Sequence, residues 1–397
     1  MKKHLLNLLV LVIVLPACEI GQKDILPEDG FLKIYNHPDE SLAFYPKSLI
    51  EVPGEGYLIL SAVKDEESEI EYPESCIIRT NEQGDMVWTR YYDWLSPVPQ
   101  LFRSGGSYGF VAMDQQLDAH ALLIDPASGE ISSEHGLGIS SPLYCHMDKQ
   151  DHLVVLGYDF VSRSTQITRY NSLFSESGSV TLASNTDLEL EILHHLNHTG
   201  QQFPFFIGEF TSGDNPGYFV SCFSNYTLRT IFLDREILNL TGDLFSFQTD
   251  EAISSAIYKR DQIFTLSGYY EGNNYIITEA ELDVNRSQSI KDLQAEQRYD
   301  LTYQAAVHSC YLETSGNSNI LLASQTNDNA IIILQYSRDS DSLINTHYRD
   351  FDQRVEVAEI IPTSDKGSAV LARIHILGKY RRPVLVKEPE RLYWEEE

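Results

Sequence analysis

The chain has 397 residues, and its acidic side chains outnumber the basic ones two to one, with 58 Asp and Glu against 29 Lys and Arg and a formal net charge of −29. Such a surface repels phosphate backbones, so the composition excludes nucleic acid as a partner. Anionic lipid surfaces and polyanionic glycans are disfavoured too, unless a local basic patch or a bound cation intervenes. Arg381 and Arg382 are too few to form such a patch.

The first 17 residues have the layout of a cleaved export signal. Lys2 and Lys3 supply a positive start, and residues 5–15 form an apolar run that is too short to span a bilayer. The run ends in Leu15-Pro16-Ala17-Cys18, which resembles the lipobox of bacterial lipoproteins. The resemblance implies that residues 1–17 are removed and that lipid on the Cys18 thiol anchors the chain to a membrane. The alternative is an ordinary secretory signal followed by a chance cysteine.

Residues 18–30 are predicted to form the lipidated tether. Within them, Gln22-Lys23-Asp24 is similar to the surface-export signal of lipoproteins from Bacteroidota. This resemblance implies a lipid-anchored protein of the outer membrane, exposed at the cell surface. The alternative is a plain polar tether, which would leave the protein facing the periplasm.

Four further cysteines, Cys76, Cys145, Cys222 and Cys310, are widely spaced and lie mostly in apolar runs. Buried free cysteines behave as small hydrophobic residues. The four fall in different units of the strand repeat, where disulfide geometry is hard to meet, so we expect free thiols. Their spacing matches no metal-binding pattern, and the sequence predicts neither a metal ion nor another cofactor.

From about residue 44 the chain alternates short apolar strands with turns rich in Gly, Asn, Asp and Ser, and no long amphipathic helix interrupts them. This pattern predicts an all-β protein. The clearest unit covers residues 48–93, with strands expected at 48–52, 56–61, 76–80 and 86–92. Four consecutive antiparallel strands of this kind form one blade of a β-propeller.

The second strand of this unit recurs through the chain at roughly the 45–60-residue spacing typical of propeller blades. Its copies are expected at 108–112, 152–157, 203–208, 263–268, 320–324 and 369–373, and third strands at 121–125, 276–280 and 331–335. The pattern predicts that residues 31–397 form a single seven-bladed β-propeller domain. Six or eight blades, or two stacked β-sandwiches, are the alternatives.

Two features support this interpretation. Gly56-Tyr57-Leu58-Ile59-Leu60 on one strand, with an Asn81-to-Gly84 turn before a strand carrying Trp88, resembles the divergent propeller repeat of Bacteroidota lipoproteins. A propeller must also close its ring, because an unpaired edge between the first and last blades would be exposed. Residues 31–35 look like a displaced strand, and we expect them to complete the last blade beside residues 383–386.

Catalytic signatures are absent from the sequence: it has no nucleophile elbow, phosphate-binding glycine loop or zinc-protease motif. The chain is therefore predicted to be a non-enzyme, although propeller enzymes can assemble sites from several blades. His146 beside Cys145, His308 near Cys310, and the pair His194 and His195 are expected on innermost strands that line the central channel. Because alternate strand residues point to opposite faces, we interpret these as polar channel residues and predict no metal site.

The turns that join second to third strands should gather on one face of a propeller, and here they are rich in Tyr, Asn and Asp. Tyrosine rings stack on sugars, while amide and carboxylate groups bind hydroxyls. The candidate binding residues are Tyr269, Tyr270, Asn273, Asn274, Asp214, Asn215, Asn327 and Asp328. The alternative is that these residues are ordinary turn formers.

The sequence therefore predicts a lipid-anchored binding or scaffold propeller of the bacterial envelope that recognises a glycan, a peptide or an envelope protein. One alternative is a propeller enzyme, a glycoside hydrolase or lyase acting on extracellular polysaccharide. Another is a structural subunit of an envelope complex.

Overall fold

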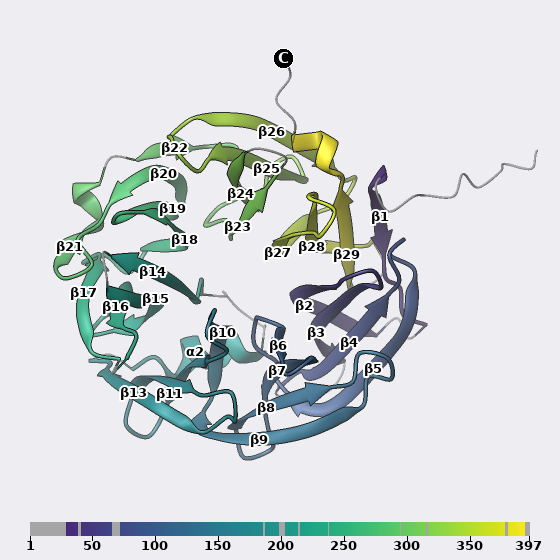
Figure 1. The fold of residues 1–397 in the computed structure, drawn as a ribbon, viewed down its shortest axis with the longest axis horizontal. Coiled ribbons are helices and arrows are strands. Elements are labelled where there is room, and N and C mark those ends of the chain that lie inside the picture. The colour runs from purple at the N-terminus through teal and green to yellow at the C-terminus, as the bar shows by residue number, and fades with distance from the viewer. Residues whose placement is uncertain are drawn as a thin grey trace, which may run out of the picture.

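The chain forms a ring of β-sheets around a central axis (Figure 1). The computed structural model describes residues 29–38, 41–65, 72–185, 187–197, 203–212, 215–236, 238–293, 295–314, 317–377 and 380–393. Hydrogen bonds join their strands into six sheets, and the largest divides into two four-stranded units that meet only through the pair Leu95 and Met113. The described residues thus make seven blades, which confirms the predicted all-β propeller.

Blades 1 to 4 follow the chain, and their strands are given from the axis outward. Blade 1 contains β2 (Leu42–Val52), β3 (Gly56–Asp65), β4 (Glu74–Thr80) and β5 (Met86–Leu95). Blade 2 contains β6 (Phe102–Ser104), β7 (Ser107–Met113), β8 (Asp118–Ile124) and β9 (Ile131–Ser140). Blade 3 contains β10 (Pro142–Met147), β11 (Leu153–Asp159), β12 (Ser164–Tyr170) and β13 (Glu176–Ala183). Blade 4 contains β14 (Phe206–Ser212), β15 (Asn215–Ser224), β16 (Thr227–Asp234) and β17 (Leu240–Phe245), edged by β21 (Ser287–Ser289).

Blades 5 to 7 complete the ring. Blade 5 contains β18 (Glu251–Arg260), β19 (Ile263–Tyr270), β20 (Asn273–Glu281) and β22 (Glu296–Arg298). Blade 6 contains β23 (His308–Glu313), β24 (Ser318–Gln325), β25 (Ala330–Ser337) and β26 (Leu343–Asp350). Blade 7 contains β27 (Val355–Pro362), β28 (Ser368–His375), β29 (Arg381–Glu388) and β1 (Phe31–Ile34). The helical segments within the described residues are α2 (Glu189–Asn197), η2 (Ile290–Asp292) and η3 (Glu390–Tyr393).

The ring closes through the first described strand, as the sequence predicts. β1 runs antiparallel to β29, with Phe31 opposite Lys387 and Ile34 opposite Val384. The backbone N–H of Tyr35 extends the ladder by donating to the Pro383 carbonyl at 3.0 Å. This pairing leaves no open edge between the last blade and the first.

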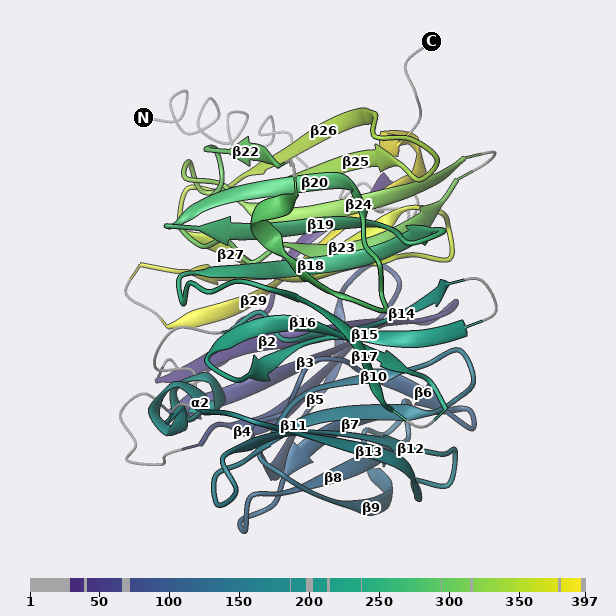
Figure 2. The ribbon, with the colours of Figure 1, turned by 90° about the vertical axis from the view of Figure 1, so that its left-hand side faces the viewer.

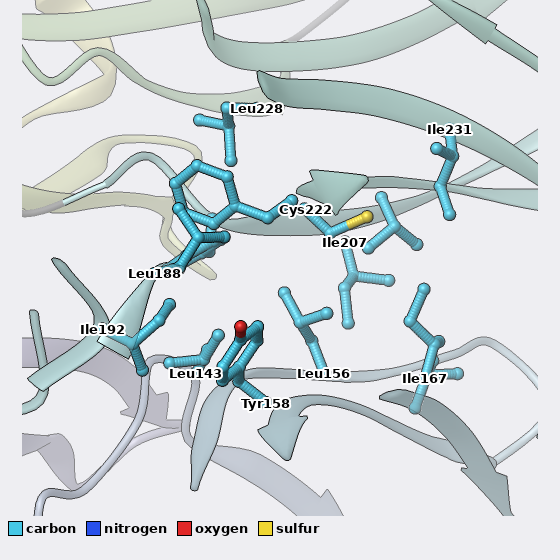
Figure 3. Close-up of a cluster of buried hydrophobic side chains, with 14 of the residues drawn as sticks. Leu143, Leu156, Tyr158, Ile167, Leu188, Ile192, Ile207, Cys222, Leu228 and Ile231 are labelled. Carbon is cyan, nitrogen blue, oxygen red and sulfur yellow. The ribbon is translucent and has the colours of Figure 1, made fainter. Parts of the chain in front are cut away.

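Each interface between neighbouring blades holds its own hydrophobic cluster, because the middle strands of every blade are covered on both faces. Figure 3 shows the cluster between blades 3 and 4, which α2 covers. Its labelled side chains are Leu143, Leu156, Tyr158 and Ile167 of blade 3, Ile207, Cys222, Leu228 and Ile231 of blade 4, and Leu188 and Ile192 beside and on α2. The clusters explain why the second and third strands read as continuous apolar runs.

Two sequence-based assignments in the fourth unit are wrong. The run at 203–208 leads into β14, the innermost strand of blade 4, whereas the second strand is β15. The error arose because β14 is as apolar as a middle strand, while β15 opens with Asn-Pro-Gly and resembles a turn. His194 and His195 lie on α2 and not on an innermost strand. One side of this helix packs into the core through Ile192 and Leu196. Leu188, just before the helix and four residues from Ile192, packs beside them.

The two faces of the ring carry different connections. In a four-stranded meander, the links between blades lie on the same face as the turns between second and third strands. The link from β13 to β14 contains α2, so we call this the helix face, and the other the hairpin face. Figure 2 shows the ring from its side, with α2 at the left. No helix among the described residues is long and apolar enough to cross a bilayer.

The four cysteines that the structure describes are free, as expected. Cys76, Cys145 and Cys222 are buried in blades 1, 3 and 4, and Cys310 on β23 is partly exposed. Cys18 lies outside the described residues.

Candidate functional site

A cavity of about 880 Å³ occupies the centre of the ring. Innermost strands supply most of its wall, from β2, β10, β14, β18, β23 and β27. The link between blades 5 and 6, residues 302–306, also lines it, as do Asn327 and Asn329 in the turn between β24 and β25. Both segments belong to the helix face, so the cavity reaches that face. We call it the central channel.

The lining of the channel mixes aliphatic side chains with aromatic rings and amides. The rings belong to Tyr144, Phe203, Phe205, Phe206, Tyr269 and Tyr303, and the amides to Gln100, Gln304, Gln325, Asn327 and Asn329. Aromatic faces stack on flat ligand surfaces, while amides donate and accept hydrogen bonds. A cavity of this size and lining fits a small organic ligand better than a folded domain.

Tyr303 stands out because its side chain is 73% exposed although it lines the channel. Its ring lies directly over Gly272 in the turn between β19 and β20. A Cβ atom at Gly272, where φ is +80°, would come within 1.9 Å of the Tyr303 ring. Gly272 thus permits both the turn and the position of the ring at the mouth of the channel.

The structure brings only some of the candidate binding residues to the channel. Tyr269 and Asn327 line it, whereas Tyr270, Asn273 and Asp328 are outside its lining among the described residues. The Tyr270 hydroxyl donates instead to the neighbouring Glu271 carboxylate at 2.9 Å.

The remaining three candidates have other positions. Asn274 is 2% exposed, so it is not the open loop residue that the sequence suggests. Asp214 lies outside the described residues. Asn215 opens β15 in a hairpin paired at Ser212, a connection between first and second strands that belongs to the hairpin face.

Basic side chains gather on one side of the channel, at the seam between blades 1 and 7. Lys47 on β2 is 7% exposed, and both burial and the nearby positive charge of Arg373 lower its pKa to about 7. Arg373 on β28 donates to the carboxylate of Glu356, which also lies 3.0 Å from the Arg354 guanidinium. Although burial opposes ionisation, these cations and His375 hold the pKa of Glu356 far below its usual range.

Glu359 is the other carboxylate in the channel wall. Burial raises its pKa to about 7, and hydrogen bonds from the Leu49 backbone N–H and the Ser48 side chain only partly oppose the shift. The same bonds fasten β27 of blade 7 to β2 of blade 1. At neutral pH this carboxyl group is therefore close to the midpoint of its titration.

Two histidine side chains and a cysteine thiol also line the channel. Burial lowers the pKa of His195 to about 3 and that of His308 to about 4, so both imidazoles are neutral at pH 7. The His195 Nδ1 accepts a hydrogen bond from the Phe203 N–H at 3.1 Å, which ties α2 to the channel. Burial raises the pKa of the Cys310 thiol. No three His, Cys, Asp or Glu side chains in the described part of the chain are placed to share a metal ion.

Cys145 and His146, which were also expected in the channel, are not part of its lining. Cys145 is buried between blades 2 and 3, and neighbouring His146 lies 3.2 Å from Gln100 and 3.5 Å from Glu209. The sequence also missed Lys47, Glu359 and Tyr303. A signal existed for the first two, because each is a charged residue in the middle of a largely apolar innermost strand.

No family model matches the chain, and no curated protein matches it either. Solved propellers do resemble it in shape. The CNH domain of AfRom2 is 9% identical over 90% of this chain and 98% of its own, with a TM-score of 0.51. The WD40 propeller domain of Doa1 (9% identity, 92% and 98% coverage, TM-score 0.49) and the Dos1 propeller (11%, 86% and 77%, 0.48) are similar. At such identities the likeness shows the propeller fold alone.

Proposed function

We propose that this protein is a binding module whose ligand is a short glycan held in the central channel. The observation that carries the proposal is the ring of aromatic and amide side chains around the 880 Å³ cavity, open at the helix face. Stacking on Tyr303 would supply affinity, and the amides of Asn327 and Asn329 would bind the hydroxyls. A concave, narrow site favours an oligosaccharide over a folded protein partner.

We also propose that lipid on Cys18 anchors the module to the bacterial outer membrane. The position of β1 then gives the orientation. Phe31 pairs with Lys387 near the end of β29 and contacts Gly84 in the turn between β4 and β5, so the chain enters the ring at the hairpin face. The 13 residues from Cys18 to Phe31 reach at most about 45 Å. The hairpin face would thus lie near the bilayer, and the channel mouth would open away from it.

The test is a glycan array probed with the purified chain lacking residues 1–17. Binding of a defined set of oligosaccharides supports the proposal. If the array shows no ligand while a stoichiometric envelope protein is recovered with the chain, the glycan proposal fails and a scaffold role replaces it.

A second candidate function is glycan cleavage, because the channel holds two carboxyl groups in opposite states. Glu356 is kept ionised by its cationic partners, whereas the pKa of Glu359 is raised to about 7, and both lie on β27. Glycoside hydrolases use such a pair as carboxylate and general acid. Turnover of an arrayed polysaccharide that Glu359→Gln abolishes would establish an enzyme, whereas binding without turnover supports the binding module.

A further inference from the structure

We infer that the glycan is acidic, and that the carboxylate of a uronate residue binds between Lys47 and Arg373 in the central channel. The inference rests on the proposed function, since it names the ligand class for the same site. Lys47 and Arg373 together form a local basic patch. Such a patch can attract an anionic glycan although the chain as a whole is acidic.

The geometry of the seam between blades 1 and 7 carries this inference. Lys47 of β2 and Arg373 of β28 both line the channel, with Lys47 7% exposed and the Arg373 side chain 19% exposed. The Arg373 guanidinium is held in place by Glu356 on one side and by the ring of Tyr45, 5.4 Å away, on the other. Two basic side chains therefore lie at one wall of a cavity large enough for a sugar.

The charges of the wall favour an anion. Lys47, Arg354 and Arg373 face two carboxyl groups, Glu356 and Glu359. Glu356 is already shared by Arg354, Arg373 and His375. Glu359 and Lys47 both have a pKa of about 7, so each carries only part of its charge at neutral pH, and their two charges offset each other, which leaves Arg354 and Arg373 against Glu356. The channel wall is thus net positive in a chain whose net charge is −29.

The like charges of Lys47 and Arg373 give the site its selectivity. Burial lowers the pKa of the Lys47 amine to about 7, and repulsion by Arg373 adds to the shift. A carboxylate placed between them would be attracted by both and would favour the ammonium form, so binding would raise the pKa of Lys47. The affinity should therefore be highest below pH 7 and should fall as Lys47 loses its proton.

Other titrating groups around Lys47 do not reverse this direction. His195 on α2 stays neutral, because its pKa of about 3 lies below the range. Glu356 stays ionised throughout, because its pKa is held far below this range. Glu359 on β27 loses its proton near pH 7, and the negative charge that it gains also weakens binding of an anion.

The experiment measures binding of a galacturonate trisaccharide and of its methyl ester to the full chain in detergent, by titration calorimetry at about pH 6 and pH 8.5. We expect the acid to bind at least about tenfold more tightly than the ester at pH 6, and this advantage to shrink at pH 8.5. Lys47→Met should remove it, and Lys47→Arg should keep it with a weaker pH dependence, since arginine does not titrate and only Glu359 then changes its charge in this range. Lys149→Met, an exposed lysine outside the channel lining, is the matched control.

A second measurement is independent of how the variants fold. Acetylation of Lys47 by acetic anhydride at pH 7.5, quantified by mass spectrometry, should slow several-fold when the acid trisaccharide is added and should not change with the ester. Equal binding of acid and ester, or an unaltered acetylation rate, overturns the inference while glycan binding stands. If neither sugar nor any arrayed glycan binds, the proposed function fails as well. Preferential binding of a tripeptide with a free carboxyl end would also overturn the sugar assignment.

Discussion

Asn274 donates a hydrogen bond from its side-chain amide to the carbonyl oxygen of Thr302, at 2.7 Å. Its Oδ1 atom accepts a second bond, from the Ala305 N–H at 2.9 Å. One buried side chain of blade 5 thereby clamps both ends of the segment that carries Tyr303 to the channel mouth. Asn274 is a positioning residue for the site and does not line it.

Replacing Asn274 by alanine should therefore destabilise the protein, by roughly 1–3 kcal/mol, because a partly buried carbonyl and a buried N–H lose their partners. Ligand affinity should fall at the same time, since Tyr303 loses its support. Asn273→Ala is the matched control, because that neighbour is exposed and should change stability by less than about 0.5 kcal/mol. Chemical denaturation of both variants measures the difference, and equal stabilities would contradict the clamp.

Removal of the closing strand tests the architecture of the ring. Deleting residues 25–36 takes away the ladder between β1 and β29 and the buried rings of Phe31 and Tyr35. Loss of one buried aromatic side chain typically costs about 3–5 kcal/mol, so the melting temperature should fall by several degrees. Deletion of residues 19–24 should leave it unchanged. Identical melting curves for the two deletions would show that β1 adds nothing to stability.

The membrane anchor can be tested in cells. Cys18→Ala should move the protein from the detergent-extracted membrane fraction to the soluble envelope fraction, because lipid chains contribute about 0.8 kcal/mol for each buried methylene. A metabolic fatty-acid probe should label the wild type and not the variant. Equal labelling of both forms would rule out lipidation at this cysteine.

The fold could be predicted from the sequence because propeller blades repeat. Middle strands buried on both faces leave continuous apolar runs, and the displaced strand at 31–35 was recognisable as one strand in excess. Blade 4 departs from this pattern. Its innermost strand β14 is as apolar as a middle strand, and a helix precedes it. The channel was harder to predict, since its wall is assembled from short stretches of six innermost strands and from the links between blades. Lys47 and Arg373 lie far apart in the sequence. They come close only because the ring closes and places blade 7 beside blade 1.

Lys47 and Glu359 should make the free energy of unfolding depend on pH in opposite directions. It should fall as the pH rises toward 7 and rise again above 7. The pKa of Glu359 is raised from 4.5 to about 7, so its protonated form stabilises the fold, and this contribution is lost as the pH rises from about 4.5 to 7. The pKa of Lys47 is lowered from 10.5 to about 7, so its contribution is present above 10.5 and is lost as the pH falls to about 7. The combined contribution of these two groups to the free energy of unfolding is therefore smallest near pH 7.

Two variants separate these contributions. Glu359→Gln should match the wild type near pH 4.5 and exceed it at pH 7 to 8, by an amount on the order of 3 kcal/mol. Lys47→Met should match the wild type most closely above pH 10 and gain stability relative to it as the pH falls to 7. Urea denaturation at each pH measures the differences. If the differences do not vary with pH, neither group is shifted in the folded state.

Tyr303 provides the most direct test of where a ligand binds. Its ring is 73% exposed at the mouth of the channel, and its position depends on Gly272 and on the Asn274 clamp. Tyr303→Ala should weaken glycan binding about tenfold, or about 1.4 kcal/mol, with little change in melting temperature, because an exposed ring adds little to the core. Tyr299→Ala is the matched control, since that ring is 74% exposed and outside the channel lining. Binding measured on the same glycan should be unaffected in the control, and a loss of equal size in both variants would place the ligand outside the channel.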